Sequence, residues 1–468
     1  MTWRSAAVRR SGIVLASTLL ALTVASGVVS ASNVVVGLSE SSGDVTVPTW
    51  LYLATGAGVV GASALLTMFV TDREFLHAIH TQSLDLSSPG VTRPLSLLGG
   101  TIAVLALVGL VYVGFAGPQG IGLTSATVLV TFVGIRAILT MTAYTVGNPW
   151  PLLNPWRHLA NALPSRDRPY PTWLGTWPAV VALLAFVWLE VVAPIVSTPW
   201  LLTTVIVVYT LVTLAGAAAF SPGEWFERAD PLSVWFRLYG AVAPIQRTDD
   251  GVTVRWPGTR LGEDDVITDL SAVAFVLVLV WELTYSGFIV TPPGIATVEL
   301  LVAIGLPPEL VYLLLLLAGY AFFCGMYWLA AGWTRSRAKT FLSQRYLAIR
   351  YAPPLLAIAA GYHVAHYLGF AISLWPAFLS SLSAPLNPDP NPTQLALTSW
   401  FGYVEIAGIL IGHVIAVWFA HAVSIDLFPG KLQAIRSQYP FIMVMIVFTM
   451  LSLYLVSLPA MDPVYVPD

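Results

Sequence analysis

Two histidines lie three residues apart in the apolar run "GYHVAHYLGF", which covers residues 361–370. His363 and His366 would point about 60° apart on a helix, on one face and within one turn. Such a pair can give two ligands to one metal ion, or one ligand and a hydrogen-bonding partner behind it. A third histidine, His413, follows the small-residue motif "GILIG" in another apolar run.

Five more titratable residues interrupt apolar runs: Arg136, Glu190, Glu282, Glu405 and His421, of which His421 falls about 12 Å further inward than His413 and is separate. A charged side chain at membrane depth is costly, so each is a functional candidate. Counted by rise per residue, the three glutamates and the three histidines fall in the middle and outer membrane, and Arg136 falls near mid-depth. One bound cation would compensate these groups together.

Imidazoles and carboxylates without a thiolate suit zinc, iron, manganese or copper(II). A metal with an open position would make bound water acidic and polarise a phosphoryl or carbonyl oxygen. Arg136 would then hold a negative oxygen and Glu190 would carry a proton, as in a hydrolase. The predicted ligands of this metal are His363, His366, His413, Glu282 and Glu405.

Two alternatives use the same residues. His363 and His413, on adjacent helices, can ligate a haem b between them, as in membrane cytochromes. Without any cofactor, Glu190, Glu282 and the histidines can form the relay of a proton-coupled or ion-coupled transporter.

The elements that would position these residues are transmembrane helices. The 468 residues are 57% hydrophobic and only 10% charged, and mean hydropathy is +0.79. Apolar runs of about 20 residues recur, each long enough to cross a bilayer. The sequence therefore predicts an all-α, multi-pass bundle of about 11 spans. We expect them near residues 12–31, 48–70, 95–116, 123–145, 174–196, 199–220, 268–290, 308–333, 351–375, 400–425 and 441–459.

The first of these spans has a second interpretation. Residues 1–31 combine three arginines, an apolar run and terminal small residues, which is also the layout of a cleaved signal peptide. Ten spans would then remain, five of them in residues 32–220 and five in residues 268–459.

Every one of the 21 Lys and Arg residues except Arg136 falls in segments on one side of this topology. The positive-inside rule makes that side cytoplasmic, with the N-terminus inside and the tail 460–468 outside a plasma membrane. The basic residues are scattered and net charge is -3, so nucleic-acid binding is excluded. The single cysteine, Cys324, excludes an intramolecular disulfide.

The connections between spans also carry patterns. In the cytoplasmic segment 221–267, Trp235, Phe236 and Tyr239 indicate an interfacial helix, and Asp250-Gly251 predicts a hairpin turn. The outer segment 376–399 is rich in Pro and Asn and predicts an irregular cap over the site. Gly408 and Gly412 predict close contact between their helix and the helix with "GYHVAH".

Four motifs carry a family resemblance: "VPTWLY", "WPAVVALLAFVWLEVVAP", "GYHVAHYLGF" and "SQYPFIMVMIVFTMLSLYLVSLP". With these motifs the chain resembles the fenitrothion hydrolase-like membrane proteins. The resemblance implies hydrolysis of an organophosphate triester, with His363 and His366 as the best-matched polar residues. Our leading sequence-based hypothesis is therefore an intramembrane metalloprotein, opening outward, that hydrolyses such esters.

Overall fold

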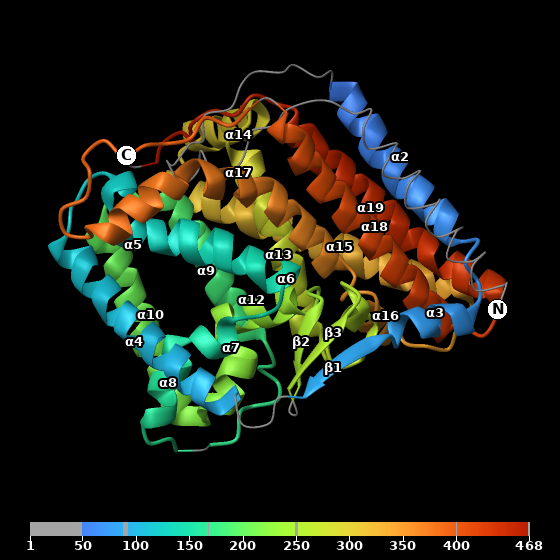
Figure 1. The fold of residues 1–468 in the computed structure, drawn as a ribbon. Coiled ribbons are helices and arrows are strands. Elements are labelled where there is room, and N and C mark those ends of the chain that lie inside the picture. Colours follow the sequence, from blue (N-terminus) through green and yellow to red (C-terminus); the bar gives the residue numbers. More distant parts are fainter. Residues whose placement is uncertain (1–48, 88–91, 167, 249–250, 399, 467–468) are drawn as a thin grey trace.

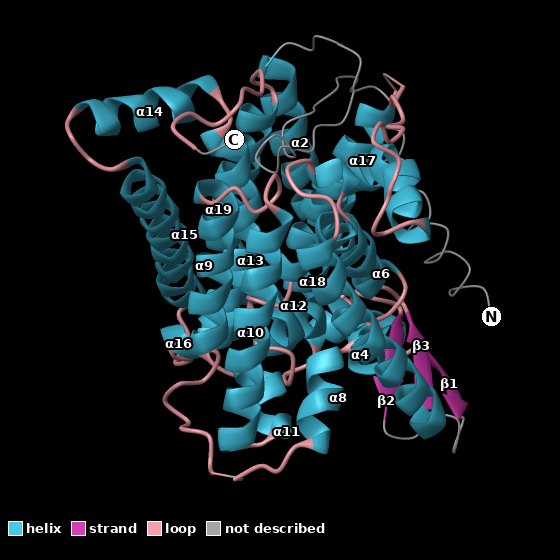
Figure 2. Ribbon diagram, turned by 90° about the vertical axis from the view of Figure 1, so that its left-hand side faces the viewer, coloured by secondary structure: helices cyan, strands magenta, loops and turns pink. Residues whose placement is uncertain are grey.

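The computed structural model describes residues 49–87, 92–166, 168–248, 251–398 and 400–466, and these form a helical bundle (Figures 1 and 2). Within them, eight helical spans are long and apolar enough to cross a membrane. They are α4 (Thr92–Ala116), the continuous α5 (Ala126–Leu129), η3 (Val130–Leu139) and α6 (Thr140–Thr145), then α10 (Pro199–Phe220), α13 (Leu270–Ile289), α15 (Pro308–Ala338), α17 (Leu355–Ser383), α18 (Phe401–Leu427) and α19 (Lys431–Val456).

Three shorter apolar helices accompany them: α2 (Thr49–Thr67), α9 (Trp177–Val192) and α14 (Pro292–Ala303). The multi-pass, all-helical prediction is confirmed at this level. The expected first span, 12–31, lies outside the described residues. Helix α14 was not expected, because it occupies the connection between the predicted spans 268–290 and 308–333.

Helix α13 is the centre of the bundle, and most of its side chains are buried. It begins after Asp269, whose carboxylate accepts a hydrogen bond of 2.9 Å from the main-chain nitrogen of Ala272, which is the geometry of an N-cap. It packs against α9, α15, α17 and α19. Glu282 is thereby carried into the interior.

Helices α17 and α18 approach each other through glycine, as the sequence predicted. A Cβ atom on Gly361 would lie 2.5 Å from the carbonyl oxygen of Gly408, and one on Gly412 would lie 2.5 Å from that of Ala357. Only glycine lets two helix backbones come this close. The helices carrying His363 and His413 are therefore neighbours in contact.

Helix α17 is longer than expected, and the predicted irregular segment starts later. It continues through Pro376 to Ser383. Proline has no amide hydrogen, and its ring clashes with the carbonyl group four residues earlier. Carbonyl groups in the preceding turn therefore lose their hydrogen bonds within the helix. The Leu395 nitrogen donates to the Ser373 carbonyl at 2.9 Å, and the Ser373 hydroxyl donates to the Leu395 carbonyl at 2.8 Å. The loop after α17 is thus bonded back onto the helix beside its proline.

A small antiparallel sheet joins segments that were expected on one side. Its strands are β1 (Ser83–Ser87), β2 (Ile245–Thr248) and β3 (Gly251–Arg255), in the order β1-β3-β2. Thr248 pairs with Gly251, which confirms the predicted hairpin, although Asp250 itself lies outside the described residues. Strand β1 was not expected, and it pairs Leu84 with Val254 across a long sequence separation.

The remaining short elements belong to the connections between spans. They are α3 (Arg73–His80), η2 (Gly122–Thr124), α7 (Trp150–Leu153), α8 (Pro155–Ala162), α11 (Pro222–Glu224), η4 (Trp225–Ala229), α12 (Pro231–Gly240), η5 (Thr259–Gly262) and α16 (Gln344–Arg350). The sheet, α8 and α16 lie at one end of the bundle and α14 lies at the other (Figures 1 and 2). This arrangement agrees with the expected alternation of the connections.

The interfacial position predicted for the aromatic helix is wrong. In α12, Trp235, Phe236 and Tyr239 are 6%, 1% and 0% exposed, and the helix packs against α6, α9 and α17. The buried carboxylate of Asp230 caps it by accepting a 2.8 Å hydrogen bond from the Ser233 nitrogen. Aromatic residues suit the headgroup level and a protein core equally well, so their pattern did not distinguish the two.

Candidate functional site

Arg136 binds two glutamates inside the bundle. Its Nη2 lies 2.9 Å from Oε2 of Glu282, and its Nη1 forms an ion pair with Oε2 of Glu190. The three residues come from η3, α9 and α13, and Glu282 is fully buried. Arg136, Glu190 and Glu282 were predicted to lie at similar depths, and in the structure they are in direct contact. The cation that compensates the two carboxylates is a side chain of the protein.

The helix that carries Arg136 is irregular at this point. Residues Val130–Leu139 form a π-helix, the wider turn that often occurs at functional sites. Just after it, the Thr140 hydroxyl accepts a 3.1 Å hydrogen bond from Nε1 of Trp235. The guanidinium of Arg136 lies over the Tyr367 ring, 5.2 Å from its centre, in cation–π geometry. Arg136 is thus held by two acids and one aromatic ring.

His363 lies beside this cluster in a cage of aromatic rings. Its Nδ1 is 3.0 Å from the hydroxyl of Tyr144. Its ring stacks on Tyr367, with centres 4.5 Å apart, and meets Tyr239 and Trp235 at 5.7 and 6.3 Å. Tyr367 therefore touches both Arg136 and His363, which links the ion cluster to the imidazole.

Four buried side-chain atoms around this cluster have no hydrogen-bond partner among the described residues: Arg136 Nε, Glu282 Oε1, Tyr239 Oη and His363 Nε2. An unpaired polar atom in a protein interior is costly, and most such atoms in native proteins are paired. Of these atoms, Glu282 Oε1 and His363 Nε2 can take up a proton, and the Arg136 and Tyr239 atoms can donate a hydrogen bond to a polar group.

The remaining predicted residues are His366, Glu405 and His413. His366 is buried on α17 and interacts electrostatically with Arg136. Glu405 is buried near the start of α18. His413 donates from Nδ1 to the Ile409 carbonyl at 2.8 Å, and its Nε2 is 2.6 Å from the Thr449 hydroxyl. Both ring nitrogens of His413 are therefore already in hydrogen bonds within the protein.

The positions of these histidines and carboxylates can be compared with what the predicted metal ion and the alternative haem would need. Among the described residues, no three or more His, Cys, Asp or Glu side chains are grouped to hold a metal ion. The α17 and α18 backbones touch at Gly361 and Gly412, while His363 bonds to Tyr144 and His413 bonds to Thr449, so each imidazole is engaged with a different neighbour. The predicted metal site and the haem alternative thus receive no support from the arrangement of these residues.

Sequence reasoning missed three tyrosines of the site. Tyr367 is four residues after His363, and this helical spacing is a signal that places both on one face. Tyr144 and Tyr239 come from α6 and α12, far away in the sequence, and no local pattern brings them to His363.

The chain matches no protein-family model, and the searches of curated proteins and of solved structures found no match. The resemblance carried by the four apolar motifs therefore stays an expectation.

Proposed function

We propose that the protein is a proton-coupled membrane transporter whose proton-binding site is the Arg136–Glu190–Glu282 cluster. The observation that carries the proposal is the pairing of two buried carboxylates with a single guanidinium. With both acids ionised, the cluster has one excess negative charge. Such a charge is unfavourable in a buried site. One bound proton removes the imbalance, and releasing it restores the charge.

Glu282 is the better of the two proton carriers. Its side chain is fully buried, whereas that of Glu190 is 9% exposed. Only Oε2 of Glu282 is engaged by Arg136, and its Oε1 has no partner among the described residues. A protonated carboxyl group can use this second oxygen to donate a hydrogen bond.

We propose that the proton moves between the cluster and the end of the bundle that carries the sheet by way of His363 and Tyr144. His363 stacks on Tyr367 beside Arg136 and bonds to Tyr144 through Nδ1. Tyr144 lies in the last turn of α6, and the main chain after it bonds to strand β2, where the Ile245 nitrogen donates to the Val146 carbonyl at 3.0 Å. The imidazole has two nitrogens and can accept a proton on one and release one from the other.

The sheet end is proposed to face the cytoplasm of a cell membrane. It gathers the connections that hold the basic residues, in agreement with the positive-inside rule. The His363–Tyr144 route would then open to the cytoplasm, and the end with α14 would face outward.

Proton uptake by purified protein tests the proposal. The chelator-treated protein is titrated in weak buffer from about pH 9 to about pH 6, a range in which exposed glutamates stay ionised, and bound protons are counted with an indicator dye. We expect Glu282→Gln to bind about one proton fewer than the wild type, because it lacks the carrier. The matched control, Glu309→Gln, changes an exposed glutamate at the start of α15. Equal loss in both variants would contradict the assignment of Glu282.

Elemental analysis of the same samples separates this proposal from the metal-dependent hydrolase. A transporter based on side chains alone binds its proton after exhaustive chelation. Stoichiometric metal in the wild type that disappears in both His363→Ala and His413→Ala would instead establish the metalloprotein.

A further inference from the structure

A second candidate site lies on the other side of α13 and α17 from the ion cluster. It is a pocket between α13, α15, α17, α18 and α19, and its walls are almost entirely apolar. Leu277, Val280, Ile358, Val444 and Phe448 are among the side chains that line it. It has room for about three water molecules, which is close to the size of one six-membered ring.

One end of the pocket is polar. Tyr362, His413, Thr449 and Ser452 line it there. His413 and Thr449 satisfy each other at 2.6 Å. The hydroxyl of Tyr362 is buried and makes no hydrogen bond of normal geometry among the described residues, although the Ser452 side chain is near enough to interact with it. The pocket therefore combines an apolar body with one available donor, which is the usual composition of a small-molecule site.

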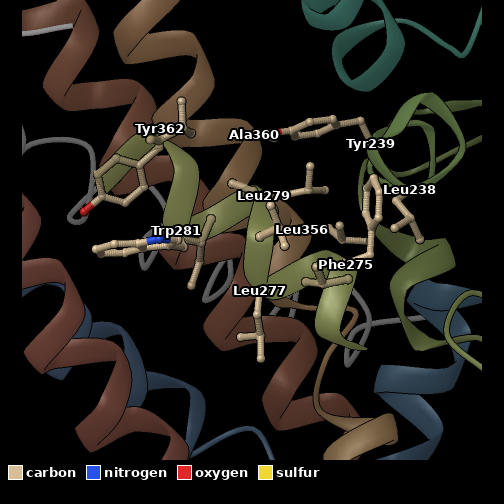
Figure 3. Close-up of a cluster of buried hydrophobic side chains, with 14 of the residues drawn as sticks. Leu238, Tyr239, Phe275, Leu277, Leu279, Trp281, Leu356, Ala360 and Tyr362 are labelled. Atoms are coloured by element: carbon tan, nitrogen blue, oxygen red, sulfur yellow. The ribbon is translucent and has the colours of Figure 1, made fainter. Parts of the chain in front are cut away.

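The two sites share their walls. In α13, Leu277 and Val280 line the pocket and Glu282 binds Arg136, and residues two apart on a helix point about 160° away from each other. In α17, Tyr362 faces the pocket while Tyr367 faces Arg136. Figure 3 shows Tyr362 beside Trp281 on one side of this region and Tyr239 beside Leu238 on the other. A movement of α13 or α17 at one site thus changes the shape of the other.

We propose that this pocket binds the transported molecule, and that this is a small, mainly apolar compound with one hydrogen-bond acceptor that faces Tyr362. Transport of this compound rests on the proposed function, whereas its binding in the pocket does not. The apolar walls exclude a charged substrate, because a charge here would have no counter-ion. The tyrosine hydroxyl selects a hydrogen-bond acceptor, such as a ring nitrogen or a carbonyl oxygen, because its proton is in no well-formed hydrogen bond among the described residues.

Binding of two fluorinated probes tests the inference. The protein in lipid nanodiscs is titrated with 3-fluoropyridine, whose ring nitrogen is an acceptor, and with fluorobenzene, which has a ring of the same size without one. Saturable binding is followed by fluorine NMR against empty nanodiscs. We expect both probes to bind the wild type, the pyridine more tightly. Tyr362→Phe should weaken only the binding of the pyridine, by about three- to tenfold, as for one lost hydrogen bond.

A second variant fills the pocket. Ala420 lines it, and Ala420→Leu should abolish saturable binding of both probes while the protein stays folded by its melting temperature. Ala422→Leu, a nearby change on α18 at a residue that is not part of the lining, is the control. Absence of saturable binding to the wild type would overturn the inference, as would binding that neither Tyr362→Phe nor Ala420→Leu alters. These results leave the proton titration of Glu282 unaffected, so the two proposals fail independently.

Discussion

At the scale of single residues, the chemistry of the site depends on which side chain neutralises the charges of Glu190 and Glu282. The apolar runs around Arg136, Glu190 and Glu282 showed that these charges need partners. They did not show the partners, because pairing depends on how three helices rotate against each other. A bound metal was one solution, and the Arg136 guanidinium between two carboxylates is the solution that the structure contains.

Removing this guanidinium should destabilise the protein strongly. Arg136→Gln leaves two buried carboxylates without a counter-ion, and we expect a loss of about 3–5 kcal/mol in the free energy of unfolding. The triple variant Arg136→Gln, Glu190→Gln, Glu282→Gln removes all three charges and should recover most of that loss. Denaturant unfolding in detergent, with exposed Arg335→Gln as control, measures both. Wild-type stability of Arg136→Gln would refute the paired cluster.

His363 and His413 should behave differently, although the sequence predicted the same role for both. His363→Ala should leave the number of bound protons unchanged and slow their uptake by about tenfold or more, as expected when a positioned proton-transfer group is lost. His413→Ala should leave the rate unchanged, because both nitrogens of that ring are bonded elsewhere. Stopped-flow mixing with a pH dye gives the rates, and equal rates in wild type and His363→Ala would exclude the proposed route.

At the scale of elements, glycine spacing was the most informative pattern. Gly408 and Gly412 predicted the contact between α17 and α18 correctly, because a small residue every fourth position leaves a groove that local sequence can show. The burial of α12 and the π-helix of η3 were not predicted. Both depend on tertiary contacts, such as the bond from Trp235 to Thr140, which no local pattern encodes.

The close helix contact can be tested with a matched pair of glycines. Gly361→Ala places a methyl group 2.5 Å from the Gly408 carbonyl oxygen, whereas a Cβ atom on Gly325 of α15 meets nothing within 4 Å. We expect Gly361→Ala to lower the free energy of unfolding by about 1–3 kcal/mol through overpacking. Gly325→Ala should be neutral or slightly stabilising. Thermal unfolding of the two variants compares them, and similar melting temperatures would contradict the contact.

At the scale of the whole molecule, the charge distribution predicted which connections share a side, and the sheet agrees with it. Strand β1 and the β2–β3 hairpin come from connections more than one span apart, yet they pair at one end of the bundle (Figure 1). The pairing of β1 with β3 could not be predicted from the sequence, because the residue pattern of short polar strands specifies their register only weakly.

Cysteine cross-linking tests this pairing. In a Cys324→Ser background, the only native thiol is removed. Leu84→Cys with Val254→Cys should form a disulfide on mild oxidation, because these residues are directly opposite. Leu84→Cys with Val252→Cys, two positions out of register, should react more slowly. Equal rates for the two pairs, followed by gel mobility, would show that the register is different.

Infrared spectroscopy of the buried carboxyl group tests the central claim most directly. A protonated acid shielded from water has a carboxyl band apart from those of surface acids, and this band grows as pH falls and Glu282 takes up its proton. We predict such a band in the wild type and in Glu309→Gln, and its loss in Glu282→Gln. A spectrum without the band at any pH at which the protein is folded, or an unchanged band in Glu282→Gln, would contradict a proton-binding site built on Arg136 and its two glutamates.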